Sequence, residues 1–431
     1  MIETAPRPVS PPVSPSLTPL TTTRGAALYI GALLGPGLLL LPGLAVAVAG
    51  PASLLAWVAL LVLSALFAVV FAAFGLRFPS AGGVIGYVTA GLGARAGLVA
   101  GWCFLAGVVA GAPVVCLIGA SYVTELTGGG RLARAGVAAL LLLVLLALAR
   151  GGLRASAVAQ LVLVGLLVGV VAVAVAGTAG SVRAANWTPF APDGWFAVAH
   201  AAAILMLSFV GWEAVAPLTA SFADPARQLT RVVAIALAVT SALYLGLAVV
   251  TVGVLGRGAA TIVPLAELLR LAVGPAGPAV AAVAAVVLTL GSVNAYINGG
   301  GAMAGHLTRP RAGAGAGAGA SAGAGVAARP EPRFLAAVAV SGLLLISLYG
   351  LGWVSPDALV AIPTTLFLAV YLGSILAAVR VLRGPARWAA VPASAAVVVM
   401  LACCGWALAL PVAVGCFCQL RKGKQLASRH H

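Results

Sequence analysis

Apolar stretches long enough to cross a lipid bilayer follow one another along almost the whole chain. A helix needs roughly 20 apolar residues to span the hydrocarbon core, and such stretches recur from residue 25 to residue 420, separated by short polar or Gly- and Pro-containing segments. The pattern predicts about twelve transmembrane helices and an all-α integral membrane protein. The expected spans are Gly25–Ala49, Ser53–Leu76, Leu98–Leu126, Arg134–Ala149, Ala155–Ala179, Trp195–Leu218, Thr230–Leu255, Pro275–Gly305, Phe334–Leu351, Pro356–Leu382, Ala386–Cys403 and Gly405–Leu420.

The composition supports a membrane protein and orients it. The chain is 62% hydrophobic and 7% charged, whereas a soluble domain carries roughly 25% charged residues. A net charge of +16 would suggest a nucleic-acid partner in a soluble protein, but here the basic residues lie between the spans. With a cytoplasmic N-terminus and twelve spans, 19 of the 24 Lys and Arg fall on the inner side and 5 on the outer side. We therefore expect both termini in the cytoplasm, membrane lipids as neighbours and no nucleic acid.

One transmembrane domain, residues 24–420, fills the chain between two tails. Residues 1–23 are rich in Pro, Ser and Thr and predict a disordered cytoplasmic tail without a signal peptide. Residues 421–431 form a basic cytoplasmic tail, and the Ala/Gly alternation over 311–325 predicts a flexible cytoplasmic linker. The use of 22 Arg against 2 Lys is typical of a GC-rich bacterium, so the expected location is a bacterial plasma membrane.

Glu213 is the one acidic residue that lies well inside a predicted span. A charge at the bilayer centre costs about 2.5–3.5 kcal/mol on one scale, so such residues are candidates for function. One interpretation places Glu213 in a central cavity, as a proton-titrating group or an anchor beside a substrate. The alternative is a structural carboxyl that ties its helix to a neighbour's backbone, or lies in the inner mouth with Arg227.

Two of the predicted spans contain an interruption. The first span carries Gly35-Pro36-Gly37, where Pro removes a backbone donor and the glycines relax the chain. The sixth span has Gly211 next to Trp212 and Glu213. Secondary transporters often build their sites from two interrupted helices in corresponding positions of inverted halves. The halves here would be residues 25–180 and 194–382, followed by two further helices over 386–420.

Three stretches resemble the amino acid, polyamine and organocation (APC) superfamily. They are the glycine-rich break at 35–37, the loop Phe78-Pro79-Ser80-Ala81-Gly82-Gly83, and Phe209-Val210-Gly211-Trp212-Glu213 followed by Phe222-Ala223-Asp224-Pro225-Ala226-Arg227. Within that superfamily the chain looks most like bacterial exporters of methionine and branched-chain amino acids. Similarity to that group includes Arg150-Gly151-Gly152-Leu153-Arg154-Ala155-Ser156 and Ser292-Val293-Asn294-Ala295-Tyr296-Ile297-Asn298. The resemblance implies the LeuT-type five-plus-five inverted-repeat fold with two added C-terminal helices.

The resemblance also implies where a substrate would bind. Its carboxylate would lie against the opened backbone at Gly35, Pro36 and Gly37, because N–H groups at a half-helix N-terminus suit an anion. Its amino group would lie near the helix carbonyls around Phe209 and Val210. The chain departs from the family at Pro36, where a small hydroxyl residue is usual, so one backbone donor and one hydroxyl are missing.

Other polar residues in the spans are secondary candidates for the binding site. Asn294, Tyr296 and Asn298 share one helix face loosely and could face the site or bond to a neighbouring helix. Trp212 could gate a cavity or simply pack. Sodium-coupled relatives use hydroxyls between the first and eighth spans, which Thr289 and Ser292 could supply, whereas some proton-coupled relatives use a lysine in the fifth span, and none is present here.

The remaining side chains predict no cofactor, no metal site and no disulfide. The six cysteines lie within or at the ends of apolar spans, as small packing residues do, and His200 is interpreted as structural. No cluster of Asp, Glu, His or Ser predicts a membrane-embedded enzyme. The sequence therefore favours a secondary transporter of small neutral, apolar amino acids, an exporter or proton-coupled antiporter. Alternatives are a different amine substrate or a non-transporting sensor, and a homodimer is left open.

Overall fold

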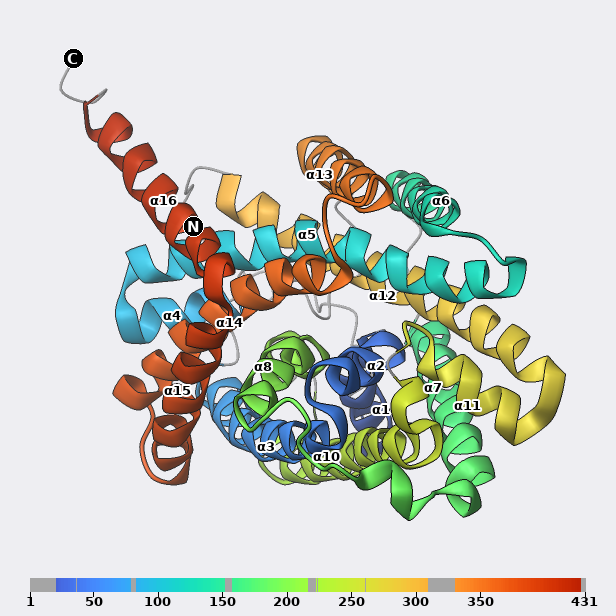
Figure 1. Cartoon of the computed structure of the whole chain (residues 1–431). Helices are drawn as coiled ribbons and strands as arrows, with labels where there is room; N and C mark the ends of the chain where they lie inside the picture. Colours follow the sequence, from blue (N-terminus) through green and yellow to red (C-terminus); the bar gives the residue numbers. More distant parts are fainter. Residues whose placement is uncertain are drawn as a thin grey trace, which may run out of the picture.

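The computed structural model describes residues 21–35, 37–78, 83–151, 157–215, 222, 224–259, 261–308 and 330–427, and helices make up most of these ranges (Figure 1). The longer helices, in chain order, are α1 (Thr22–Leu33), α2 (Gly37–Ala49), α3 (Ser53–Arg77), α4 (Val84–Leu92), α5 (Ala94–Thr127), α6 (Arg131–Arg150), α7 (Ala157–Thr178), α8 (Phe196–Leu205), α10 (Pro225–Val250), α11 (Pro264–Val273), α12 (Gly277–Thr308), α13 (Pro332–Gly350), α14 (Pro356–Val381), α15 (Pro385–Cys403) and α16 (Ala409–Ala427).

Within the described ranges, nine helical segments are long and apolar enough to cross a membrane. The two apolar segments 196–209 and 405–419 are shorter. One of the nine, Gly37–Arg77, contains α2 and α3, joined by a short turn at Gly50–Ala52. The all-helical membrane architecture is confirmed, and the count of twelve spans with cytoplasmic termini stays a prediction.

Both predicted interruptions are present as breaks in the helices. Helix α1 ends at Leu33 and α2 begins at Gly37, so the first apolar span consists of two helices. The second break follows α8, which continues through the 3₁₀ turn η4 (Met206–Phe209). The chain is then extended at Val210, and the short helix α9 (Trp212–Val215) starts after Gly211.

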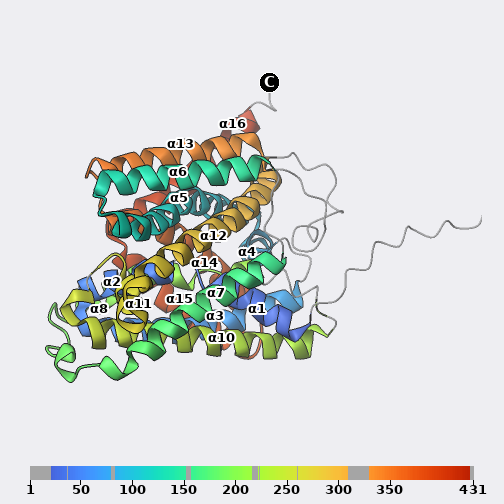
Figure 2. The same cartoon turned by 90° about the vertical axis from the view of Figure 1, so that its right-hand side faces the viewer.

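The helices pack in two groups. The group that we call the bundle consists of α1, α2, α3, α8, α9 and α10, in which α1 lies on α10, α2 on α8, and α3 on both α8 and α10. The scaffold group consists of α5, α6, α12 and α13, with α5 lying across α12 and α6 beside α13. Both views show the two groups as separate layers (Figures 1 and 2). Helix α14 contacts both groups and α7 joins α1 and α10 to α12.

Several boundaries differ from the sequence-based expectation. Helix α1 starts at Thr22, inside the predicted tail, because the Thr21 hydroxyl caps it by accepting a hydrogen bond from the Arg24 N–H at 3.3 Å. Helix α16 continues into the predicted basic tail as far as Ala427, since a helix does not have to end where its apolar run ends. The short helices α4 and α11 were not expected. The 311–325 linker, residues 79–82 and residues 152–156 lie outside the described residues.

Candidate functional site

The two broken helices touch each other at Gly211. A Cβ atom added there would lie 2.4 Å from the carbonyl oxygen of Ala32 in α1, and the φ angle of Gly211 is +152°. Residues with a side chain rarely adopt this conformation. Glycine is therefore required at this position for the break of the sixth span to lie directly against the end of α1.

Tyr244 of α10 links the same two breaks through its hydroxyl. The oxygen lies 2.7 Å from the carbonyl oxygen of Leu33, at the end of α1, and 2.7 Å from that of Ser208 in η4. The tyrosine ring packs on Trp57 of α3 and on Phe209, with ring centroids 5.2 Å apart in both pairs. One side chain thus connects α10 to the ends of both half-helices.

The backbone around the breaks offers both donors and acceptors. The first turn of a helix has N–H groups without intrahelical partners, and α2 begins its first turn at the buried Gly37. The η4 turn ends at Phe209 and the chain is extended at Val210 (φ −75°, ψ 131°), so the last carbonyls of that turn have no helical partner. The Phe209 ring packs on Trp57, with centroids 5.9 Å apart. The arrangement suits a small zwitterion.

Glu213 is bonded to the start of its own helix and to α14. Its side chain is only 4% exposed. The Oε2 atom accepts a hydrogen bond from the Tyr371 hydroxyl at 2.5 Å and another from the Gly211 N–H at 2.9 Å. The same hydroxyl accepts from the Trp212 N–H at 3.2 Å. The carboxyl therefore joins the break of the sixth span to α14, close to the backbone that would hold a substrate.

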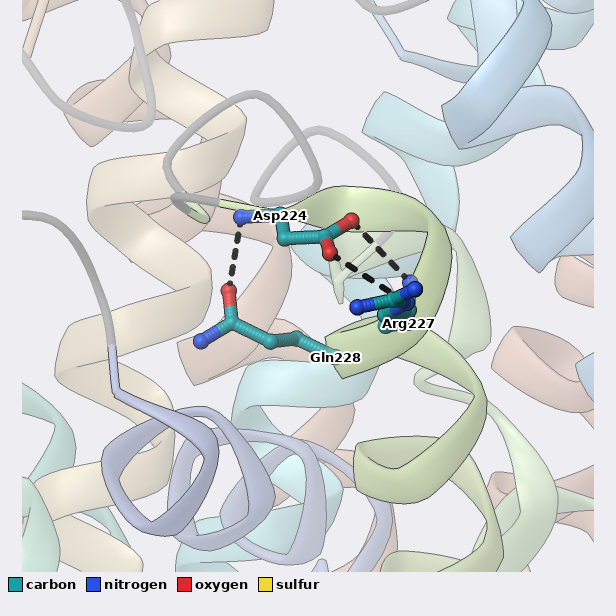
Figure 3. A network of polar contacts seen from close by, with 3 residues as sticks. All are labelled: Asp224, Arg227 and Gln228. Atoms are coloured by element: carbon teal, nitrogen blue, oxygen red, sulfur yellow. Dashed lines mark hydrogen bonds and ion pairs between the residues drawn. The ribbon is translucent and has the colours of Figure 1, made fainter.

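Glu213 does not pair with Arg227, which was one of the two structural alternatives. Arg227 belongs to the first turn of α10, where its Nε lies 3.9 Å from Oδ2 of Asp224 and its side chain is 87% exposed. Asp224 caps that helix: its Oδ1 accepts from the Arg227 N–H at 3.3 Å, and its own N–H donates to Oε1 of Gln228 at 3.0 Å (Figure 3). This polar network serves the start of α10.

Trp212 is packed rather than open to a cavity. Its side chain is fully buried, its indole N–H donates to the Ser64 hydroxyl at 2.9 Å, and its ring meets Tyr29 edge-on at 6.3 Å. A second aromatic contact lies at the N-terminal end of α1, where the Phe222 ring lies so close to Gly25 that a Cβ atom there would be 2.5 Å from it. Aromatic side chains therefore pack against α1 at Tyr29 and Gly25, on the N-terminal side of the first break.

Of the three polar residues predicted on α12, Tyr296 lies near Glu213, and the two asparagines bond within the helix. The amide of Asn298 donates to the backbone oxygen of Asn294 at 2.8 Å and to its side-chain oxygen at 3.2 Å. The Tyr296 ring lies 6.4 Å from the Phe367 ring of α14, and Tyr296 is close enough to Glu213 and Tyr244 to interact with both electrostatically. The Thr289 hydroxyl donates to the Val115 carbonyl of α5 at 3.3 Å. The hydrogen bonds between Asn294 and Asn298 thus lie within α12, and Thr289 joins α12 to α5.

His200 and two of the cysteines lie elsewhere. Among the described residues, a cavity of about 300 Å³ is enclosed by α8, α14 and the turn between α15 and α16, and His200, Asp357, Cys403 and Cys404 contribute to its wall. Within the same ranges the six cysteines form no disulfide. This cavity has no lining residue in common with the two breaks.

Sequence analysis missed Tyr371, Tyr244 and Ser208. A signal for the tyrosines existed, because a tyrosine in the middle of an apolar span needs a partner for its hydroxyl. Gly35 and Gly37 flank the first break as predicted, and Pro36 between them lies outside the described residues. The structure thus brings Gly35 and Gly37 together with residues 209–213, in the neighbourhood of the three residues that were missed.

Comparison with known proteins matches this architecture to one family. The family model described as "Amino acid permease" matches residues 20–309, which contain both breaks and the bundle. The chain belongs to the amino acid permease family. This permease is therefore a multi-pass protein of the bacterial plasma membrane, in a family of transporters rather than enzymes.

Relatives along nearly the full length support the assignment. The permease is 31% identical to an uncharacterized amino acid permease, YecA of Bacillus subtilis, over 94% of this chain and 96% of the relative. It is 29% identical to the L-methionine/branched-chain amino acid exporter YjeH of Escherichia coli, over 90% and 92% of the two chains. The branched-chain amino acid permease BcaP of Bacillus subtilis is 26% identical over 53% of each.

Proposed function

We propose that this permease is a secondary active transporter that exports small neutral, apolar amino acids by alternating access, in exchange for protons. The observation that carries the proposal is the contact between the two broken helices at Gly211, with backbone donors on one side and carbonyls on the other. Such a site offers backbone dipoles to the ammonium and carboxylate groups of an amino acid.

The surroundings of the breaks favour an apolar side chain on the substrate. Leu33, Leu38, Leu41, Phe209 and Val210 are all buried there. The one charged residue among these groups is Glu213, which is bonded to Tyr371 and to Gly211. The exporter YjeH, whose name states methionine and branched-chain amino acids, is similar over 90% of this chain and supports the same class of substrate.

Proton exchange is assigned to Glu213. Among the acidic residues it alone lies well inside a predicted span, and it contacts the backbone at the break through the Gly211 N–H. A change in its protonation would alter the hydrogen bonds that fix the start of α9. This coupling links proton binding to the geometry of the substrate site.

Counterflow in proteoliposomes tests the function. Vesicles containing the purified permease are loaded with unlabelled leucine or methionine, and entry of the labelled amino acid is followed at two pH values. Accumulation above that in empty vesicles is the expected result. An imposed pH gradient should then drive efflux of preloaded leucine. No accumulation with a panel of neutral amino acids would favour a different amine substrate or a sensor that has lost transport.

A further inference from the structure

The Ser208 hydroxyl is buried without a hydrogen-bond partner. The residue is 1% exposed, and its Oγ is one of two buried side-chain polar atoms in the described ranges that bond to nothing. Leaving a buried polar group unpaired is unfavourable, and native structures contain few such groups. A group of this kind needs an explanation, and one explanation is a ligand that it binds.

Other buried hydroxyls in the helices bond to their own backbone. A serine or threonine in a membrane helix commonly donates to the carbonyl four residues earlier. Seven buried residues do so here: Ser121, Thr124, Thr178, Thr240, Thr364, Thr365 and Ser374. Ser208 differs because it lies in the 3₁₀ turn at the end of α8 and not in a regular α-helix.

The hydroxyl lies beside the first break. The backbone of Ser208 is fixed because its carbonyl oxygen lies 2.7 Å from the Tyr244 hydroxyl. The Oγ atom lies next to Gly37, such that a Cβ atom added to Gly37 would be 3.0 Å away from it. Gly37 is the first residue of α2. N–H groups in the first turn of a helix have no intrahelical partners; here the Leu38 N–H donates to the Gly35 carbonyl at 3.2 Å. A hydroxyl donor and a helix N-terminus thus lie together.

We infer that Ser208 is a substrate-binding residue whose hydroxyl donates a hydrogen bond to the carboxylate of the transported amino acid. The inference rests on the proposed function. The carboxylate occupies the N-terminus of α2, and the Ser208 hydroxyl supplies the donor that Pro36 cannot, because proline has neither an N–H nor a hydroxyl. In this permease the hydroxyl that selects for a carboxylate therefore comes from the sixth span and not from the first.

The test replaces the hydroxyl and measures which part of the ligand is affected. Ser208→Ala should raise the KM for leucine in counterflow by about tenfold to a hundredfold, the loss of a hydrogen bond to a charged group, with kcat unchanged. In the ligand-free protein the Tm should not fall, since the deleted hydroxyl has no partner. Ser208→Cys keeps a similar volume and a weak donor, so its KM for leucine should lie between those of the wild type and Ser208→Ala.

A carboxylate-free competitor and a matched variant complete the test. Inhibition by 3-methylbutylamine, which is leucine without its carboxylate, should be the same in wild type and Ser208→Ala. Ser374→Ala is the matched control, because it also removes a buried hydroxyl, one that bonds to the Val370 carbonyl at 2.9 Å in α14. That variant should leave the KM for leucine unchanged.

Three results would overturn the inference while the proposed function stood: an unchanged KM in Ser208→Ala, an equal loss of leucine and 3-methylbutylamine binding, or a Tm below that of Ser374→Ala. Wild-type vesicles that accumulate none of the neutral amino acids would instead remove the proposed function, and the inference with it. The wild-type measurement therefore separates the two failures.

Discussion

At the scale of the residue, Gly211 combines a positive φ angle with a close backbone contact, so a side chain there is unfavourable on two counts. Gly211→Ala would place a methyl group 2.4 Å from the Ala32 carbonyl oxygen. It would also force a side chain into a conformation that costs about 1–3 kcal/mol. We expect a lower Tm in detergent and no counterflow. Gly136→Ala on α6 is the control, because a Cβ atom there meets nothing within 4 Å. A Gly211→Ala variant that transports normally would show that the two breaks do not need this contact.

Glu213 allows a prediction about pH. Glu213→Gln keeps an oxygen that can accept a hydrogen bond from Tyr371 or from the Gly211 N–H, but it no longer titrates. We expect a folded protein whose counterflow rate is the same at the two pH values. Glu267→Gln serves as the comparison, because Glu267 forms its ion pair with Arg270 within α11, at 2.7 Å. The Glu267→Gln variant should keep the pH dependence of the wild type. If the Glu213→Gln profile still follows the wild-type profile, another group couples transport to protons.

At the scale of the element, the two breaks are connected to α10 by the hydroxyl of Tyr244. Tyr244→Phe keeps the ring packing on Trp57 and Phe209 but removes the hydroxyl that meets Leu33 and Ser208. Leaving a buried acceptor unpaired costs about 1–3 kcal/mol, so the Tm should fall.

The transport rate of Tyr244→Phe is the second measurement of what this hydroxyl does. The rate of counterflow should fall in Tyr244→Phe, because the two half-helices are no longer held to α10. Tyr349→Phe removes a hydroxyl that accepts a hydrogen bond from the Arg134 guanidinium at 2.7 Å in the scaffold group. This variant should lower the Tm without slowing transport. Equal transport rates in the two variants would mean that the hydrogen bonds of Tyr244 stabilise the bundle but have no role in transport.

The sequence predicted the elements better than their contacts. Apolar runs located the spans, and the Gly35-Pro36-Gly37 and Gly211 signals located both breaks, because glycine and proline act on the local backbone. The helices α4 and α11 were missed, since runs of 9 and 10 residues are too short to show a spanning pattern. Glu213 was chosen from its charge, but its partner Tyr371 is 158 residues away, and apolar periodicity does not specify which tyrosine it meets.

At the scale of the whole molecule, the asymmetry of basic residues predicts the topology. With 19 of 24 Lys and Arg on the inner side, both termini should be cytoplasmic. A C-terminal green fluorescent protein should fluoresce, and a C-terminal alkaline phosphatase should be inactive. An active phosphatase would show an odd number of spans, and the counts of inner and outer basic residues would then be 15 and 9.

The hydroxyl of Tyr244 has one further consequence. A phenol carries a single proton, yet two carbonyl oxygens lie 2.7 Å from this one. At any instant only one of them receives this proton, and when Ser208 receives it, the Leu33 oxygen still accepts a bond from the Gly35 N–H at 3.0 Å. A cation that approached the other oxygen would not have to break a bond to the phenol. Rotation of the O–H bond about the C–O bond of Tyr244 moves the proton from one carbonyl oxygen to the other. The carbonyl that lacks this proton therefore alternates between α1 and η4.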